Sequence, residues 1–165
     1  MKNTLIIFCI LSLFLTSFQK PEFKSKSNQF VGTWKLIECI SKEKDGEITY
    51  PFGENPVGQI FYDPKGNMSV QIMKPGVKRF VSDNWLLATP GEAQDAYLAY
   101  LAYYGTYTVK KDSDLIVHHI ASSLFPNWVN QDQRRFYEFK GNQLILKTPV
   151  IGTTEFQLTW QKIAD

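Results

Sequence analysis

Turn-forming residues recur along this chain at short intervals, and they separate runs in which apolar and polar side chains alternate. Alternation with a period of two places successive side chains on opposite faces of a β-strand. Asp45-Gly46, Pro64-Lys65-Gly66 and Gly141-Asn142 are typical of hairpin turns. This punctuation indicates an all-β protein. The expected strands cover residues 32–41, 57–62, 68–73, 103–110, 115–122, 131–139, 143–148 and 153–163.

These strands follow one another without the intervening helices of a parallel βαβ sheet, so we expect them to pair antiparallel. An open sheet would leave two exposed edges, and closing it into a barrel removes both. In the last expected strand Phe156, Leu158 and Trp160 share one face, and polar residues occupy the other. The pattern predicts an up-and-down antiparallel barrel of eight strands or slightly more, with an interior that side chains or one small ligand can fill.

One segment has a helical pattern instead. Thr89 has the character of an N-cap, Pro90 suits the first helical position, and Glu92 completes a capping box. The spacing predicts a short amphipathic helix over residues 92–102. Its tyrosine stripe is expected to pack on the barrel or to cover its mouth. The stripe consists of Tyr97, Tyr100 and Tyr104.

The first residues have the layout of a secretory signal peptide. Lys2 precedes an apolar run from Leu5 to Leu15, and small or polar residues follow. The run is shorter than the roughly 20 residues that a membrane-spanning helix needs. A retained N-terminal anchor is the alternative. We expect residues 1–19 to be a signal peptide, 20–29 a flexible polar tether and 30–165 one domain of an exported protein, periplasmic or extracellular.

Composition limits the partners of this domain. Its single cysteine, Cys39, excludes an intramolecular disulfide, so a packed core must stabilise it. The formal net charge is +2 and the basic residues are scattered, which does not predict nucleic-acid binding. No second long apolar run follows the leader, so no stable membrane insertion is expected after cleavage. We expect a monomer, because barrel closure leaves no free strand edge, and no cofactor, because no phosphate-binding loop is present.

The motif Gly32-Thr33-Trp34 is similar to the Gly-x-Trp signature that opens lipocalins and related calycin barrels, in which the tryptophan closes one barrel end. Further blocks, in order from Phe30 to about Pro149, resemble the bacterial and fungal lipocalin-like domain family. The resemblance implies a lipocalin-like barrel around a cavity and implies little about chemistry. Among these blocks are Tyr50-Pro51-Phe52-Gly53, Gly58-Gln59-Ile60-Phe61-Tyr62-Asp63, Tyr104-Gly105-Thr106-Tyr107, Val117-His118-His119, Pro126-Asn127-Trp128 and Gln133-Arg134-Arg135-Phe136.

Strand alternation places Arg135, Tyr137 and Phe139 on the cavity wall and Arg134 on the solvated face. An inward arginine must be paired or hydrogen-bonded. Two interpretations stay open. Arg135 stacks on Trp34 and closes the barrel end, or its planar guanidinium holds a carboxylate, phosphate or enolate of a ligand.

His118 and His119 are neighbours in one expected strand, so they face opposite sides and cannot bind one metal together. We therefore expect no metal site. Both faces of this strand are apolar, and the family-like block favours His118 as the inward residue. Its imidazole either bonds to a backbone or tyrosine oxygen, or exchanges a proton with a ligand.

Two more residues complete the candidate site. Tyr107 shares a strand face with Gly105 and Val109, which is expected to point inward, and Trp128 is expected on a loop beside the barrel opening. The candidate ligand-binding residues are Arg135, His118, Tyr107, Tyr137 and Trp128.

Three functional hypotheses follow. The first is a carrier or sensor that holds one small, mostly apolar ligand in the cavity, with Arg135 and His118 orienting a polar head group. The second is an enzyme, a cyclase, isomerase or hydratase, that uses the same groups to stabilise an enolate and to move a proton. The third is a structural or interaction module whose barrel is filled by its own side chains. No motif specifies catalytic residues.

Overall fold

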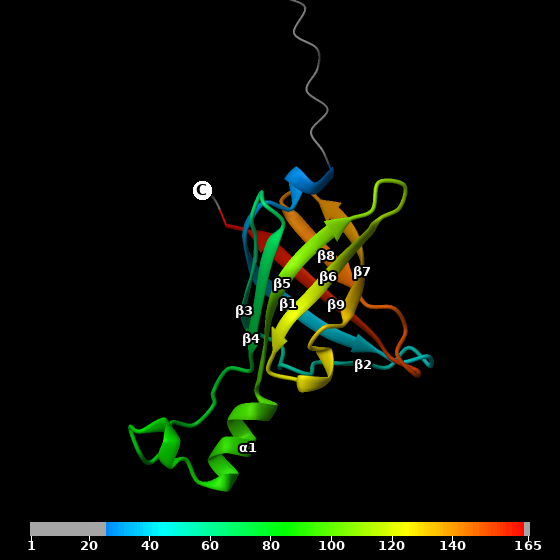
Figure 1. Cartoon of the computed structure of the whole chain (residues 1–165). Coiled ribbons are helices and arrows are strands. Elements are labelled where there is room, and N and C mark those ends of the chain that lie inside the picture. The colour runs from blue at the N-terminus through cyan, green and yellow to red at the C-terminus, as the bar shows by residue number, and fades with distance from the viewer. Residues whose placement is uncertain (1–25, 164–165) are drawn as a thin grey trace, which may run out of the picture.

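The structure is a computed structural model that describes residues 26–163, and the expected signal peptide lies outside this range. Within it, one antiparallel sheet of nine strands curls into a barrel (Figure 1). The residues before the barrel, Lys26–Gln29, form a short 3-10 helix, η1. In chain order the strands are β1 (Gly32–Lys42), β2 (Ile48–Thr49), β3 (Val57–Tyr62), β4 (Asn67–Met73), β5 (Tyr100–Val109), β6 (Leu115–Ser123), β7 (Asp132–Lys140), β8 (Gln143–Lys147) and β9 (Glu155–Lys162).

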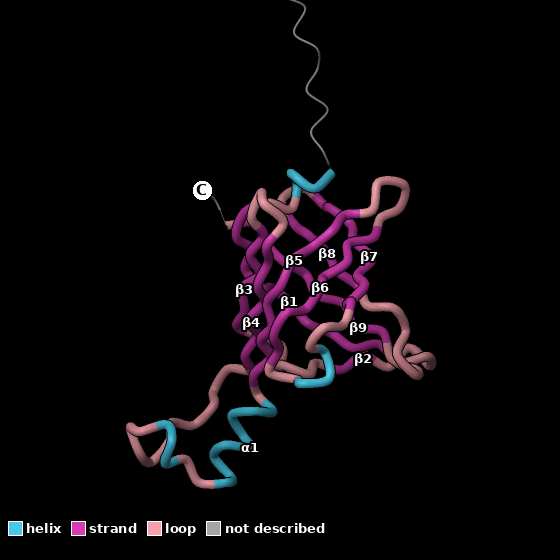
Figure 2. The backbone as a smooth tube through the Cα atoms, in the orientation of Figure 1, coloured by secondary structure: helices cyan, strands magenta, loops and turns pink. Residues whose placement is uncertain are grey.

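The first long strand closes the barrel. β1 pairs with β3 over residues 32–35 and with β9 over residues 34–42, so that Trp34 lies between Ile60 on one side and Lys162 on the other. A bulge at Ile37, between the paired residues Leu36 and Glu38, lets β1 bend from one partner toward the other. The ring therefore contains eight strands, and the two-residue β2 adds only to the end of β1 (Figure 2). The expected eight-stranded antiparallel barrel is confirmed.

One end of the barrel is filled by aromatic rings. Phe30, which follows η1, is fully buried, and its ring packs edge-on against Tyr137 and Phe139 with centroids 4.9 and 5.0 Å apart. Trp34 Nε1 donates a hydrogen bond to the Phe30 carbonyl oxygen at 2.7 Å. Lys162 Nζ lies 5.3 Å from the centroid of the Trp34 ring. The tryptophan of the Gly-x-Trp motif thus belongs to the filled end.

A glycine permits close contact between β5 and β6. The pairing shifts by one residue between Tyr104 and Gly105, and Ala121 is the extra residue on β6. A Cβ atom on Gly105 would overlap the carbonyl oxygen of His119. The bulge therefore requires a residue without a side chain at this position.

The helical segment is shorter than expected, and the expected tyrosine stripe is wrong. Helix α1 covers Pro90–Leu98 and has the expected capping box, in which Thr89 and Glu92 bond reciprocally. It ends where β5 begins, because residues 100–106 pair with β4. Tyr97 therefore lies on α1, whereas Tyr100 and Tyr104 lie on the outer face of β5. No residue of α1 is buried, so this helix does not cover the barrel mouth.

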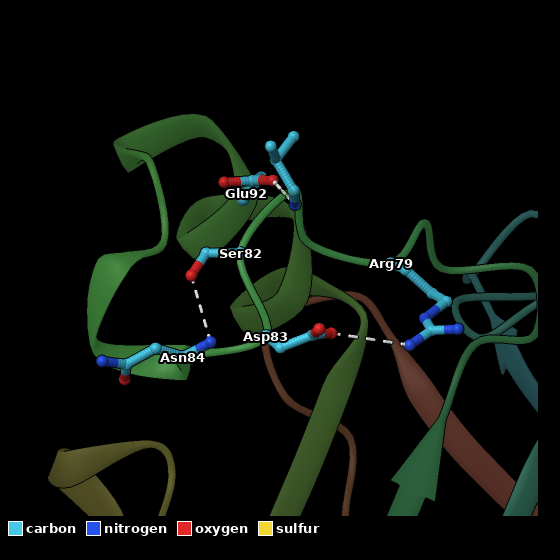
Figure 3. A network of polar contacts seen from close by, with 6 residues as sticks. Arg79, Ser82, Asp83, Asn84 and Glu92 are labelled. Carbon is cyan, nitrogen blue, oxygen red and sulfur yellow. Dashed lines mark hydrogen bonds and ion pairs between the residues drawn. The ribbon is translucent and has the colours of Figure 1, made fainter.

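The segment between β4 and β5, residues 74–99, projects from the barrel at the end opposite η1, and we call it the β4–β5 arm (Figure 1). It contains the 3-10 helix η2 (Trp85–Leu87) and α1. Polar contacts link residues within the arm (Figure 3): the Glu92 carboxylate accepts from Val81 N at 2.7 Å, and Arg79 pairs with Asp83 at 3.7 Å. Hydrogen bonds from Val81 and then Thr89 lower the pKa of Glu92. No helix within residues 26–163 is long and apolar enough to cross a bilayer.

Candidate functional site

The half of the barrel away from Phe30 contains a cavity of about 300 Å³. Its wall comes mainly from inward side chains of the strands, and residues of the β2–β3 loop and of η3 (Pro126–Trp128) border it. Most of the cavity surface is apolar. The lining residues are Cys39, Pro51, Phe52, Ile60, Ile72, Leu101, Tyr103, Trp128, Gln133, Arg135, Leu146, Thr148, Ile151, Phe156, Leu158 and Trp160.

Arg135 is the one cation among these lining residues. It points inward from β7, as expected, and only 6% of it is exposed. Its Nη1 donates to the carbonyl oxygen of Arg134 at 2.7 Å, and the lining residues of the described chain include no Asp or Glu. The interpretation that Arg135 stacks on Trp34 is wrong, because the cation over that ring is Lys162. The guanidinium faces the cavity instead.

Behind Arg135, a buried chain of hydrogen bonds crosses the barrel interior. His118, fully buried on β6, bonds through Nε2 to the Tyr62 hydroxyl at 2.8 Å and through Nδ1 to the Tyr103 hydroxyl at 3.3 Å. Tyr103 also lines the cavity. The sequence interpretation of His118 as an inward histidine bonded to tyrosine oxygens agrees with this geometry.

This chain of hydrogen bonds is electrically neutral. Burial, and next the nearby charge of Arg135, hold the pKa of His118 well below the ordinary histidine value. Burial raises the pKa of Tyr62 and of Tyr103, although Arg135 opposes both shifts. An imidazole between two neutral phenols has one nitrogen that donates and one that accepts, so each bond of the chain is satisfied.

His119 faces the outside of the same strand. Its Nδ1 lies 2.6 Å from Asp132 Oδ1 and its Nε2 3.0 Å from Thr108 Oγ1. The two histidines therefore point to opposite faces, as the alternation predicts. Residues 26–163 contain no group of three or more His, Cys, Asp or Glu side chains that could hold a metal ion.

The other three candidates are divided between the two ends of the barrel. Trp128 borders the cavity, and its ring meets Tyr103 edge-on with centroids 5.5 Å apart. Tyr107 and Tyr137 face inward, but they lie among the rings of the filled end and do not line the cavity. The Tyr107 hydroxyl donates to the Asp63 carbonyl oxygen at 2.9 Å. The structure thus places Arg135 and Trp128 on the same cavity. His118 does not line the cavity and lies behind Tyr103, to which it is bonded.

The sequence interpretation missed three polar lining residues. Gln133 lies two residues before Arg135 and shares its face, so alternation alone could have identified it. Tyr103 adjoins the segment assigned to a helix and therefore received no role. Thr148 lies just beyond β8, where its Oγ1 accepts from Phe156 N at 3.0 Å.

Comparison with known proteins places this geometry in a family. The model of the lipocalin-like domain family matches residues 31–163. A curated relative from Aspergillus oryzae, the 4'-hydroxy-3'-methoxypropiophenone carrier protein ppsC, is 34% identical over 107 residues, which are 58% of this chain and 96% of the relative.

Several solved barrels are similar in structure. A redesigned β-barrel has a TM-score of 0.43 and 14% identity, and the match covers 85% of this chain and 96% of that one. Fatty-acid-binding protein 1 of Echinococcus granulosus has a TM-score of 0.39 and 16% identity over 82% of this chain and 98% of its own. A mutant of the fluorescent protein UnaG has a TM-score of 0.38 and 10% identity, with 83% and 98% covered.

Proposed function

We propose that this chain, which belongs to the lipocalin-like domain family, is an exported carrier that holds one small, mostly apolar molecule in its barrel. The observation that carries the proposal is the cavity of about 300 Å³, whose lining is almost wholly apolar and includes a single cation, the buried Arg135. This size is at the lower end of known ligand pockets, which suits a ligand of one or two rings. A barrel filled by its own side chains would have no such space.

The carrier relative supports the same function. Its name gives its cargo as 4'-hydroxy-3'-methoxypropiophenone. We propose that the present chain carries a molecule of similar character, an apolar body with a few oxygen atoms. Phe52, Trp128 and Phe156 offer flat apolar surfaces to the body, and Arg135 and Gln133 offer donors to the oxygens.

Native mass spectrometry of the full chain tests the carrier function. We expect a bound molecule that dissociates on activation, and a rise in Tm when a matching fatty acid, isoprenoid or aromatic ketone is added. Leu101→Trp should fill the cavity and abolish both signals. Tyr100→Trp is the matched control, because Tyr100 lies next to Leu101 on β5 but on the outer face, where it is 37% exposed. A wild-type protein that binds none of the tested compounds would contradict the proposal.

Export is tested separately. The layout of residues 1–19 supports cleavage of a signal peptide before release from the cytoplasm. Intact-mass measurement of the protein recovered from the periplasm or the medium should give a mature chain that begins close to residue 20. Full-length protein retained in the cytoplasm would contradict export without affecting the carrier function.

A further inference from the structure

A buried positive charge without a counter-ion is costly, and Arg135 is such a charge. The residue is 6% exposed and lines an apolar cavity. None of the four ion pairs within residues 26–163 involves it. Its Nη1 donates to the Arg134 carbonyl oxygen, and the nearby Tyr103 hydroxyl is neutral, so neither group compensates the charge.

Within residues 26–163, the titratable groups around the cavity do not supply the missing anion. Burial raises the pKa of Tyr103 and of Tyr62, and it raises the pKa of Cys39, on the β1 wall of the cavity, to about 12. All three groups stay protonated and neutral near pH 7. His118 stays neutral as well, so it adds no second cation. The titratable groups that line the cavity, Cys39, Tyr103 and Arg135, together with Tyr62 and His118 behind them, therefore sum to one positive charge.

We propose that the cargo is bound as a singly charged anion, the conjugate base of a weak organic acid, with its charged oxygen on Arg135 and its apolar body along the rest of the cavity. This inference rests on the proposed carrier function. One guanidinium matches the single negative charge of a carboxylate, a phenolate or an enolate, and its planar fork can bind both oxygens of a carboxylate. A phosphate monoester would bring a second negative charge that no lining residue compensates. The neutral Tyr103 hydroxyl beside Arg135 is itself bonded to His118, which bonds in turn to Tyr62.

Preferential binding of the anion should change the pKa of the bound acid. If the anion binds more tightly than its conjugate acid by some factor, the pKa of the bound acid falls by the logarithm of that factor. The carrier should therefore take up a weak acid in its ionised form even below the pH at which that acid ionises in water. A neutral pocket would have the opposite effect, because an apolar wall favours the uncharged form.

Two fluorescent probes with the same ring system separate charge recognition from cavity filling. N-phenyl-1-naphthylamine is neutral, and 1-anilinonaphthalene-8-sulfonate adds one negative charge. We expect wild-type protein to bind both and Arg135→Gln to weaken the anion at least tenfold while the neutral probe keeps its affinity. Arg135→Lys should restore part of the loss. Arg134→Gln is the matched control, because Arg134 is the adjacent residue on the exposed face of β7.

The outcomes distinguish the two proposals. If neither probe binds wild-type protein, the carrier function fails. If the neutral probe binds and Arg135→Gln leaves the anion unaffected, the carrier stands and the anion inference is overturned.

A second measurement needs only wild-type protein, so it does not depend on whether a variant folds. The absorbance of 4-nitrophenol distinguishes the phenol from its phenolate, so titration with wild-type protein reports the pKa of the bound probe directly. We expect that pKa to fall by one unit or more. A bound probe whose pKa is unchanged or raised would overturn the inference.

Discussion

At the scale of single residues, alternation predicts the face of a side chain but not its depth in the barrel. Arg135, Tyr137 and Tyr107 all face inward, as their strand positions predict. Only Arg135 reaches the cavity, whereas Tyr137 and Tyr107 lie in the filled end. Depth depends on how the tilted strands are staggered around the ring, and that stagger is a property of the closed sheet. A strand read in isolation cannot reveal it.

The buried imidazole should make stability depend on pH. Burial lowers the pKa of His118 in the folded barrel, whereas the same histidine in the unfolded chain keeps the ordinary pKa of about 6.5. Below that pH the unfolded chain therefore binds a proton that the folded barrel does not. The free energy of unfolding should be highest above that pH and fall as the pH drops from about 7 to 5. We expect the urea midpoint to fall in this window, and to fall less in His118→Gln. His119→Gln is the control, because that imidazole is outside the barrel, and an equal effect there would contradict the prediction.

The bulge glycine should tolerate no side chain. In Gly105→Ala the new Cβ would overlap the His119 carbonyl oxygen, so β5 and β6 must move apart. We expect a loss of about 1–3 kcal/mol in the free energy of unfolding, measured by urea titration. Gly91→Ala in α1 is the matched control, since a Cβ there meets nothing within 4 Å, and it should be neutral or slightly stabilising. Equal effects of the two substitutions would show that close packing at the bulge is not the cause.

At the scale of the elements, the strands were predictable because turn chemistry and alternation agree along most of the chain. The predicted helix runs past the end of α1 for a simple geometric reason. Tyr100 and Tyr104 are four residues apart, which places them on one face of a helix and also on one face of a strand. Pairing of β5 with β4 decides between the two, and it puts both tyrosines on the outside of the barrel.

The β4–β5 arm should be dispensable for the barrel. Trp85, Leu86 and Leu87 at η2 are 76%, 70% and 66% exposed, so chymotrypsin should cut there first and leave a barrel that remains associated. The Lys74 N–H already bonds to the Ala99 carbonyl oxygen at 2.8 Å, across the base of the arm. Replacing residues 75–98 with Asn-Gly should therefore give a tight hairpin that retains the Tm within a few degrees and still binds N-phenyl-1-naphthylamine. Loss of the folded barrel would show that the arm supports it.

At the scale of the whole molecule, closure was predictable from the sequence because consecutive antiparallel strands leave two edges that only a ring removes. The division of that ring into a filled half and a hollow half was not predictable from the sequence. The pattern of inward residues is apolar and aromatic in both halves. Only packing shows that the rings around Phe30 fill their end of the barrel, whereas the inward side chains of the other half leave a cavity.

The filled end should carry much of the stability. Trp34→Ala removes a side chain that is 2% exposed, packs beneath Lys162 and bonds to Phe30. We expect a loss of about 3–5 kcal/mol in the free energy of unfolding. Trp85→Ala, the same change in the exposed arm, should alter it by no more than about 0.5 kcal/mol. Urea titration of both variants checks the difference, and comparable losses would contradict the assignment of Trp34 to the core.

The pairing of β1 with β9 also bears on the position of the chain ends. The Ile163 N–H bonds to the Thr33 carbonyl oxygen at 2.9 Å, so the start of β1 and the end of β9 are direct neighbours. Strand order around the barrel therefore does not depend on where the polypeptide starts. A circular permutant, in which a short linker joins 163 to 30 and new termini open at η2, should rebuild the same ring of strands.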